Sequence, residues 1–259
     1  MLALITGASS GIGRELAKLY AADSYDIVLV ARRLELLNAL ATELQAIQPI
    51  QVHTIAADLG QHQAGKLLVS DLESRGIQVD ALVNNAGFGL LGPFSEADQA
   101  KMLEMVQLNV TTLVELTGLL LPGMVQRGHG HVLNVASTAA FQPGPLMAVY
   151  YATKAFVLSF SEAIAEELRG SGVTVTALCP GPTRTGFGEV AGMQKTGLFD
   201  GPNVLDTASV AQAGYRAAQR GQFSVVPGFL NRLLVFSVRL MPRWLIRKLI
   251  KQVQSGRSG

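Results

Sequence analysis

The sequence is short of the residues that hold small secreted proteins together. It has one cysteine, Cys179, in 259 residues, so no internal disulfide framework can form. Aromatic residues make up 6% of the chain and charged residues 15%, against 49% hydrophobic residues, so the expected core is aliphatic. A chain of this length can bury such a core without disulfides or metals. The length suits one large α/β domain or two small ones. A single cysteine fits a reducing compartment, and we expect a cytoplasmic protein.

Long hydrophobic runs are also lacking. No stretch of about 18 uninterrupted apolar residues occurs, so a spanning helix is not expected. The opening run 2–5 is too short for a signal peptide and follows no basic leader. We therefore expect an intracellular protein, either free in the cytoplasm or peripheral at a membrane surface.

Acidic residues are missing from the end of the chain. After Asp206 there are nine Lys or Arg residues and no Asp or Glu, whereas the preceding part is net acidic. Such asymmetry favours an anionic partner or surface, although a solvated helix face gives the same pattern. No nucleic-acid partner is expected, because the basic residues gather in the tail with no exposed aromatic side chain among them beyond Trp244.

Short β-rich runs alternate with longer helical patterns along most of the chain. Alternation of this kind predicts a parallel sheet covered by helices on both faces. The expected strands are 2–6, 26–30, 50–56, 81–83, 131–135, 173–178 and 223–226. The expected helices lie near 12–22, 33–46, 61–75, 98–126, 152–170 and 207–219.

Two later segments depart from this alternation. The Gly-rich stretch 186–203 lacks periodicity, and loops of this length often form lids or binding loops. The tail from Phe229 to Val253 is helix-like and broken at Pro242. We expect residues 1–228 to form the domain and residues 229–259 to form a basic amphipathic extension. That extension could contact a membrane, cap a pocket or pack on another subunit.

A glycine-rich turn follows the first expected strand. Residues 6–13 read TGASSGIG, and a helical pattern follows. Glycines let the backbone approach a pyrophosphate closely, and the start of a helix offers free N–H groups to the anion. A tight turn alone would also use glycines, but this position between strand and helix favours dinucleotide binding.

The end of the second expected strand indicates which dinucleotide. An NAD-preferring fold places an acid there, but Arg32 and Arg33 occupy the position. Asp26 lies at the opposite end of the strand, and Glu35 falls inside the next helix. Two guanidinium groups suit a 2′-phosphate, so we predict NADP(H), the alternative being two ordinary helix-start residues.

A reactive pair is predicted at the start of the helix near 152–170. Tyr150 and Lys154 are four residues apart and share a helix face. An ammonium about 4 Å from a phenol favours the phenolate by roughly 4 kcal/mol at an effective dielectric near 20. Tyrosine could then act as an acid/base, although spacing alone leaves Tyr151 as a competitor. Ser137 follows a strand end, where its hydroxyl could polarise a carbonyl.

Several motifs together resemble the short-chain dehydrogenase/reductase family, specifically its NADP-preferring subgroup of about 250 residues. They occur in the family's order between residue 2 and about residue 226: TGASSGIG at 6–13, NNAG at 84–87, Asn109, Ser137, Tyr150-x-x-x-Lys154 and Pro180-Gly181. The resemblance implies a Rossmann-type, doubly wound sheet of seven parallel strands in a single domain. Helices near 98–126 and 152–170 often form a subunit interface in this family, so the resemblance implies a homodimer or homotetramer, although these helices could equally bury against their own sheet.

The resemblance also implies roles for matched residues. Tyr150 would protonate the carbonyl, Lys154 would lower the tyrosine pKa and hold the nicotinamide ribose, and Ser137 would orient the carbonyl. Asn109 would lie in a helix kink and support a water relay to Lys154. The implied cofactor-binding residues are Gly7, Ser9, Ser10, Gly11, Ile12, Gly13, Arg32, Arg33, Asp58, Leu59, Asn84, Ala86, Gly87, Tyr150, Lys154, Pro180, Gly181, Thr183 and Thr185.

These observations predict an NADP(H)-dependent oxidoreductase that transfers a hydride between nicotinamide and a carbonyl or alcohol, with a lipophilic small molecule as substrate. The alternative is a non-catalytic NADPH-binding sensor or scaffold on the same fold. No metal site is expected, because His129 and His131 lack acidic or cysteine partners nearby and fit a turn before a strand. We expect Cys179 to be a small buried filler rather than a reactive thiol.

Overall fold

A computed structural model describes residues 1–193 and 201–255. Seven parallel strands form one sheet in the order β3-β2-β1-β4-β5-β6-β7. Strands β1 to β3 extend the sheet in one direction, and β4 to β7 extend it in the other. This arrangement confirms the predicted doubly wound fold. The strands are β1 (Leu2–Thr6), β2 (Asp26–Ala31), β3 (Val52–Ala56), β4 (Ala81–Asn84), β5 (Gly130–Val135), β6 (Val173–Leu178) and β7 (Ser224–Val225).

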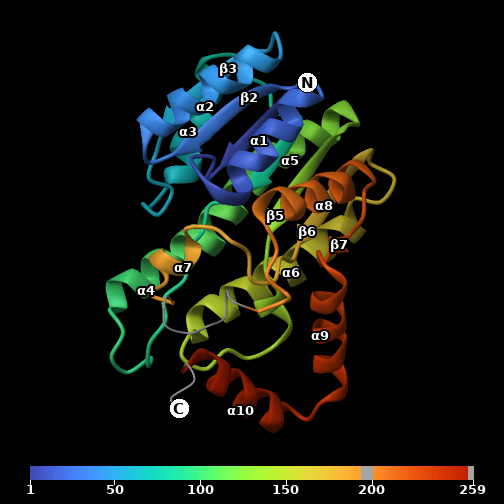
Figure 1. Cartoon of the computed structure of the whole chain (residues 1–259). Helices are drawn as coiled ribbons and strands as arrows, with labels where there is room; N and C mark the ends of the chain where they lie inside the picture. Colours follow the sequence, from blue (N-terminus) through green and yellow to red (C-terminus); the bar gives the residue numbers. More distant parts are fainter. Residues whose placement is uncertain (194–200, 256–259) are drawn as a thin grey trace.

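Helices cover both faces of the sheet, as Figure 1 shows. One face packs against α1 and α8 together with α2, and the other against α3, α5 and part of α6. The helices are α1 (Gly11–Ala22), α2 (Leu34–Ile47), α3 (Ala64–Ser74), α4 (Gln99–Val106), α5 (Leu113–Arg127), α6 (Ala148–Glu167), α7 (Phe187–Val190), α8 (Thr207–Gln219), α9 (Phe229–Leu240) and α10 (Arg243–Gln254).

The central strands are apolar on both sides because each side faces a helix layer. In β1, Ile5 belongs to the cluster under α1 and α8, while Leu4 belongs to the cluster under α3 and α5. The side chains of Leu4 and Ile5 are both fully buried. Burial on both faces explains why the sequence shows continuous apolar runs there rather than alternation.

Most expected elements are present, with shifted ends. The helix expected over 98–126 is interrupted by a π-helical turn, η1 (Gln107–Thr112), between α4 and α5. Within the otherwise aperiodic stretch 186–203, α7 forms a single short turn, and residues 194–200 lie outside the described part of the chain. The predicted break at Pro242 separates α9 from α10.

The helical run Gln99–Arg127 is long and apolar enough, by length and composition, to cross a membrane, although no such helix was expected. Core helices pass the same test. Here Leu116 and Met124 pack in the cluster beneath α3 and α5, and the run also carries Asn109. Its buried side is therefore explained by the sheet that it covers.

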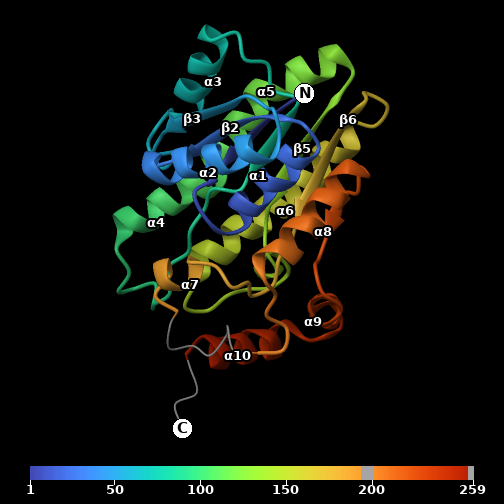
Figure 2. The ribbon, with the colours of Figure 1, turned by 45° about the horizontal axis from the view of Figure 1, so that its top comes forward.

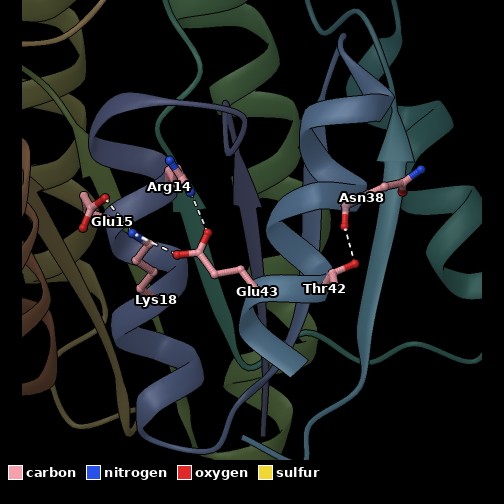
Figure 3. A network of polar contacts seen from close by, with 6 residues as sticks. All are labelled: Arg14, Glu15, Lys18, Asn38, Thr42 and Glu43. Carbon is pink, nitrogen blue, oxygen red and sulfur yellow. Dashed lines mark hydrogen bonds and ion pairs between the residues drawn. The ribbon is translucent and has the colours of Figure 1, made fainter. Parts of the chain in front are cut away.

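A surface network joins α1 to α2 (Figure 3). Glu43 of α2 accepts from Arg14 at 2.5 Å and contacts the Lys18 ammonium at 3.2 Å, and Lys18 also reaches Glu15. The hydrogen bond from Arg14 lowers the pKa of the Glu43 carboxyl. The network ties together two helices that begin beside the cleft described next, since Gly11 at the start of α1 and Arg33, just before α2, both line it.

Candidate functional site

A cleft of about 1030 Å³ opens at the carboxyl ends of the strands. Its first part, the cofactor half, is lined by segments that follow β1, β2, β3 and β4: residues 7, 9–12, 30–33, 57–59 and 85–88. Its second part, the substrate half, is lined by Met147, Tyr151, Phe187, Met193 and side chains of α9 and α10. Ser137, Tyr150 and Lys154 lie among the lining residues of this same cleft.

The loop after β1 has the backbone that a close approach requires. Gly7 and Gly11 have φ values of +64° and +59°, in the left-handed region that favours glycine. Ser10 precedes α1 without a side-chain cap, so the first N–H groups of the helix have no partner from that side chain. Gly11 and Ile12 line the cleft at this helix start. An anionic pyrophosphate fits these donors.

Gly13 does not line the cleft and has a packing role instead. A Cβ atom at Gly13 would lie 2.4 Å from Asn85 Nδ2 and 2.5 Å from the Gly7 oxygen. Asn85 Nδ2 donates to the Thr6 and Gly7 carbonyls, at 2.9 and 3.1 Å. The absence of a side chain at Gly13 therefore leaves room for the Asn85 amide to hold the glycine-rich loop through these two hydrogen bonds.

Arg32 and Arg33 stand at the end of β2 on the wall of the cofactor half. Both are exposed, and Arg33 Nη2 donates to Ser9 Oγ at 3.4 Å. This contact joins the strand end to the glycine-rich loop. Asp26 lies at the other end of β2 and accepts from the Gln51 N–H, so it is not available to the cleft.

In the NNAG segment, one residue that was predicted to line the cofactor groove lies elsewhere. Ala86 and Gly87 line the cleft as expected, but Asn84 does not. Asn84 is buried and donates to Thr117 Oγ1 at 3.1 Å and Asn134 Oδ1 at 2.9 Å. Its neighbour Asn85 faces the cleft instead. Side chains alternate across a strand, so adjacent asparagines at a strand end point to different surroundings.

The segment after β3 borders the same half of the cleft. Asp58 and Leu59 both line it. Asp58 accepts from the Gly60 N–H at 3.1 Å and from Gln61 Nε2 at 3.1 Å, which fixes its carboxylate at the turn. The Leu59 carbonyl accepts from Thr112 Oγ1 at 2.8 Å, so the turn is held against η1.

Tyr150, Lys154 and Ser137 converge at the centre of the cleft. Tyr150 and Lys154 come from the first turns of α6, and the Lys154 nitrogen lies 5.9 Å from the centroid of the Tyr150 ring. Lys154 Nζ donates to the Val135 carbonyl at 2.7 Å, so β5 holds the ammonium in place. Ser137 Oγ accepts from the Ala139 N–H at 3.1 Å and donates to the Pro180 carbonyl at 3.4 Å. It lies close enough to Tyr150 to influence the phenol pKa.

Burial determines the direction in which the pKa values of Tyr150 and Lys154 shift. Desolvation raises the pKa of the Tyr150 phenol well above its usual value, and the Ser137 side chain opposes that rise. Desolvation also lowers the pKa of Lys154 to about 8. The spacing of Tyr150 and Lys154 predicts that the ammonium lowers the phenol pKa. Burial dominates instead, because loss of hydration disfavours the charged form of each group.

Asn109 occupies the π-helical turn and is buried away from the cleft lining. Its Nδ2 donates to the Phe88 carbonyl at 3.0 Å and Thr153 Oγ1 at 3.1 Å, and its Oδ1 accepts from the Phe88 N–H. The expected kink is present as the π turn. Asn109 thereby links the segment after β4 to α6, next to Lys154.

The segment after β6 closes the cleft from the other side. Pro180, Gly181, Thr183 and Thr185 all line it. A Cβ atom at Gly181 would lie 2.5 Å from Asn231 Oδ1, so the first turn of α9 packs directly on this glycine. Asn231 is buried and donates to the Pro227 carbonyl at 3.1 Å.

The tail forms part of the site, which no motif in the sequence indicated. Leu234, Val238 and Met241 come from α9 and its end, and Ile246 and Ile250 come from α10. Gln254 Nε2 donates to the Tyr151 hydroxyl at 2.8 Å, and both side chains are buried. Of the three roles left open for the tail, the structure places it at the pocket. The amphipathic pattern of the tail was the available signal, but it did not specify the surface against which the apolar face packs.

Two remaining candidates have structural roles. His131 begins β5, is buried, and pairs with the Tyr20 hydroxyl at 2.7 Å, and desolvation lowers its pKa to about 4. Cys179 is fully buried, and desolvation raises its pKa to about 12. The described residues contain no group of three or more potential metal-ligating side chains.

Comparison with known proteins gives consistent matches. The short chain dehydrogenase family matches residues 1–195. The chain is 42% identical to a sulfoacetaldehyde reductase of Chromohalobacter salexigens over 185 residues, which cover 71% of this chain and 72% of that protein. It is 31% identical to the very-long-chain 3-oxoacyl-CoA reductase of Mus musculus over 255 residues, covering 96% and 78% of the two chains. A solved short-chain dehydrogenase from Sphingobium yanoikuyae, in complex with NADPH, superposes with a TM-score of 0.82 and 32% identity, covering 92% of this chain and 93% of that one.

Proposed function

Because the chain belongs to the short chain dehydrogenase family, we propose that its cleft binds NADP(H) and interconverts a carbonyl and an alcohol. The protein is an oxidoreductase that acts on C=O or CH–OH groups. The observation that carries the proposal is the joint presence of Tyr150, Lys154 and Ser137 in one cleft with a glycine-rich helix start. A sensor would not need that convergent set, so we favour catalysis over the non-catalytic alternative.

The cofactor half fits a dinucleotide phosphate. The free helix start and the two left-handed glycines would hold the pyrophosphate, while Arg32 and Arg33 would hold the 2′-phosphate. Asp58 would contact the adenine, and Thr183 and Thr185 would lie at the nicotinamide end. When bound, NADPH supplies a hydride to the carbonyl carbon.

The chain's own residues would handle the carbonyl oxygen. Ser137 would donate a hydrogen bond to that oxygen, and Tyr150 would deliver the proton that makes the alcohol. Lys154, held by the Val135 carbonyl, would stabilise the phenolate left on Tyr150 and hold the nicotinamide ribose. A high phenol pKa suits this direction, because the group keeps its proton until the oxygen gains charge. Asn109 would position Lys154 and support a water relay.

The walls of the substrate half support a lipophilic substrate. Met147 and Phe187 flank Tyr150, whose ring lies 5.2 Å from that of Phe187. Ile250 of α10 packs against the same cluster. We propose that residues 1–228 form the catalytic domain and that residues 229–259 extend it to complete this wall.

The proposed quaternary state rests on exposed apolar side chains of α4, α5 and α6. Leu103 of α4, Leu119 of α5 and Phe156 of α6 are exposed, as a subunit interface on these helices would require. We propose a homodimer or homotetramer that uses this face. The cytoplasmic location and a peripheral membrane contact through the tail stay predictions, the latter supported by the exposed cations of α9 and α10.

The proposal is tested with NADPH oxidation against a panel of lipophilic ketones and aldehydes. Tyr150→Phe should lower kcat by roughly 10²–10⁴-fold, because it removes the proton donor. Tyr151→Phe is the matched control and should leave kcat almost unchanged, because Tyr151 has no role in the proton transfer. Equal rates for Tyr150→Phe and the wild-type chain on every accepted substrate would overturn the mechanism. Equal affinity for NADPH and NADH would overturn the cofactor assignment.

A further inference from the structure

Helix α9 has apolar side chains on two opposite faces. One face, which includes Leu234, Val235 and Val238, lines the cleft. The other is a stripe at steps of four, three and four residues, formed by Phe229, Leu233, Phe236 and Leu240. Phe229 is 75% exposed and Leu240 is 73% exposed. A soluble helix normally has one apolar face, so the outer stripe needs a partner.

Helix α10 adds charge and an aromatic residue to this surface. Ile246 and Gln254 are buried on its inner side, whereas Trp244 is 63% exposed. Lys248 and Lys251 lie on the same side of the helix as Trp244, one and two turns further along. Figures 1 and 2 place α9 and α10 together at one end of the molecule, away from β3 and α3.

We define the tail patch as the exposed apolar and basic residues of these two helices: Phe229, Arg232, Leu233, Phe236, Arg239, Leu240, Arg243, Trp244, Arg247, Lys248 and Lys251. Its six cations are all exposed. None of them forms an ion pair with another residue in the described part of the chain. No Asp or Glu follows Asp206 in the sequence.

We infer that the tail patch docks on the anionic surface of a lipid bilayer. A bilayer surface matches both kinds of side chain in the tail patch. The apolar and aromatic side chains can enter the boundary of the acyl chains, while Lys and Arg contact anionic lipid headgroups. A second copy fits poorly. A twofold contact through the patch would place cations against cations with no acid between them.

The mode of attachment is interfacial. Each of α9 and α10 has 12 residues, whereas a spanning helix needs about 20 apolar residues. The inner faces of the same helices line the substrate half of the cleft. The bilayer would therefore lie against the outer faces of α9 and α10, whose inner faces would contact a lipophilic substrate in the cleft. Docking itself does not depend on the proposed chemistry.

The test is co-sedimentation of the full chain with vesicles of phosphatidylcholine alone or with about one third phosphatidylserine. The wild-type chain should bind the anionic vesicles more tightly, and binding should weaken between roughly 0.1 M and roughly 0.5 M salt. Lys248→Glu with Lys251→Glu should reduce partitioning by at least about 25-fold, since each cation contributes a factor of about five. Lys66→Glu with Lys101→Glu, two exposed lysines elsewhere, should leave binding unchanged.

A double substitution of apolar residues distinguishes insertion of side chains into the bilayer from attraction by charge alone. Leu233→Gln with Phe236→Gln should also weaken binding, whereas Ile47→Gln with Leu67→Gln, exposed to a similar degree, should not. Thermal unfolding and turnover of a water-soluble aldehyde confirm that each variant is folded. Absence of vesicle binding by the wild type, or equal binding by the patch and control variants, would overturn the inference. So would patch variants that dissociate an oligomer in the absence of lipid.

Discussion

The cofactor half of the cleft is built from short segments that each follow a strand, whereas the substrate half joins residues far apart in the chain. Gly7, Arg32 and Asp58 occupy turns after β1, β2 and β3, so strand order alone brings them together. Tyr151 and Gln254 meet across 103 residues. The first half depends on backbone conformation, and the second on side-chain packing of the tail. Changes in the two halves should therefore have separable effects.

The largest separable effect is expected at Arg32. Arg32→Ala should raise the Kd for NADPH by roughly 10–100-fold, because a charge-assisted bond to phosphate contributes about 1.5–3 kcal/mol. The Kd for NADH should hardly change. Fluorescence titration measures both constants, and Arg75→Ala, at an exposed arginine just after α3, is the control. A parallel loss for both cofactors would show that Arg32 does not read the 2′-phosphate.

Gly13→Ala should damage the cofactor half through packing. The new Cβ would lie 2.4 Å from Asn85 Nδ2 and 2.5 Å from a backbone oxygen, so the loop must shift. We expect a loss of about 1–3 kcal/mol in the free energy of unfolding, together with weaker NADPH binding. Gly118→Ala, where no atom lies within 4 Å, should be neutral or stabilising. Urea unfolding measures the stability of both variants, and similar values would contradict the packing role.

Lys154, between the two halves, should make stability depend on pH. Its pKa falls from 10.5 to about 8 on folding, so above pH 8 the unfolded chain binds the proton that the folded chain releases. Stability from this group is therefore constant below pH 8 and rises from there toward pH 10.5.

Urea unfolding at about pH 7, 8 and 9 measures this dependence. Lys154→Met should lack the rise, whereas a rise of the same size in that variant would assign it to other groups. The range stops at pH 9 because the Cys179 pKa, raised from 9.0 to about 12, acts in the opposite direction above it.

The smallest effect is expected in the substrate half. Gln254→Leu removes the donor to Tyr151 but also removes Gln254 Oε1, a buried atom with no hydrogen-bond partner among residues 1–193 and 201–255. The net cost should be about 0.5–1.5 kcal/mol. The KM for a lipophilic carbonyl should change several-fold, while the affinity for NADPH stays the same. Gln252→Leu, an exposed neighbour, is the control. A change in NADPH affinity would show that the two halves are coupled.

Local pattern determined the sheet, the glycine-rich turn and the pair at Tyr150 and Lys154. Strand burial, a helix start and a four-residue spacing are short-range properties, so they are visible in the sequence alone. The same logic misplaced Asn84, because a strand end decides which of two adjacent asparagines faces the cleft. Local pattern also gave no sign of the π turn at Asn109, where a kink was expected only through the family resemblance. The turn forms where α4 and α5 meet the segment after β4.

Only the tertiary structure decided where the tail lies and how the central groups are charged. An amphipathic helix shows that it has an apolar face, but its sequence does not contain the surface that this face meets; here the surface is Gly181, Tyr151 and their neighbours. Desolvation likewise depends on everything packed around a group. Spacing could therefore pair Tyr150 with Lys154, but it could not show that burial, acting on both side chains, moves their pKa values most.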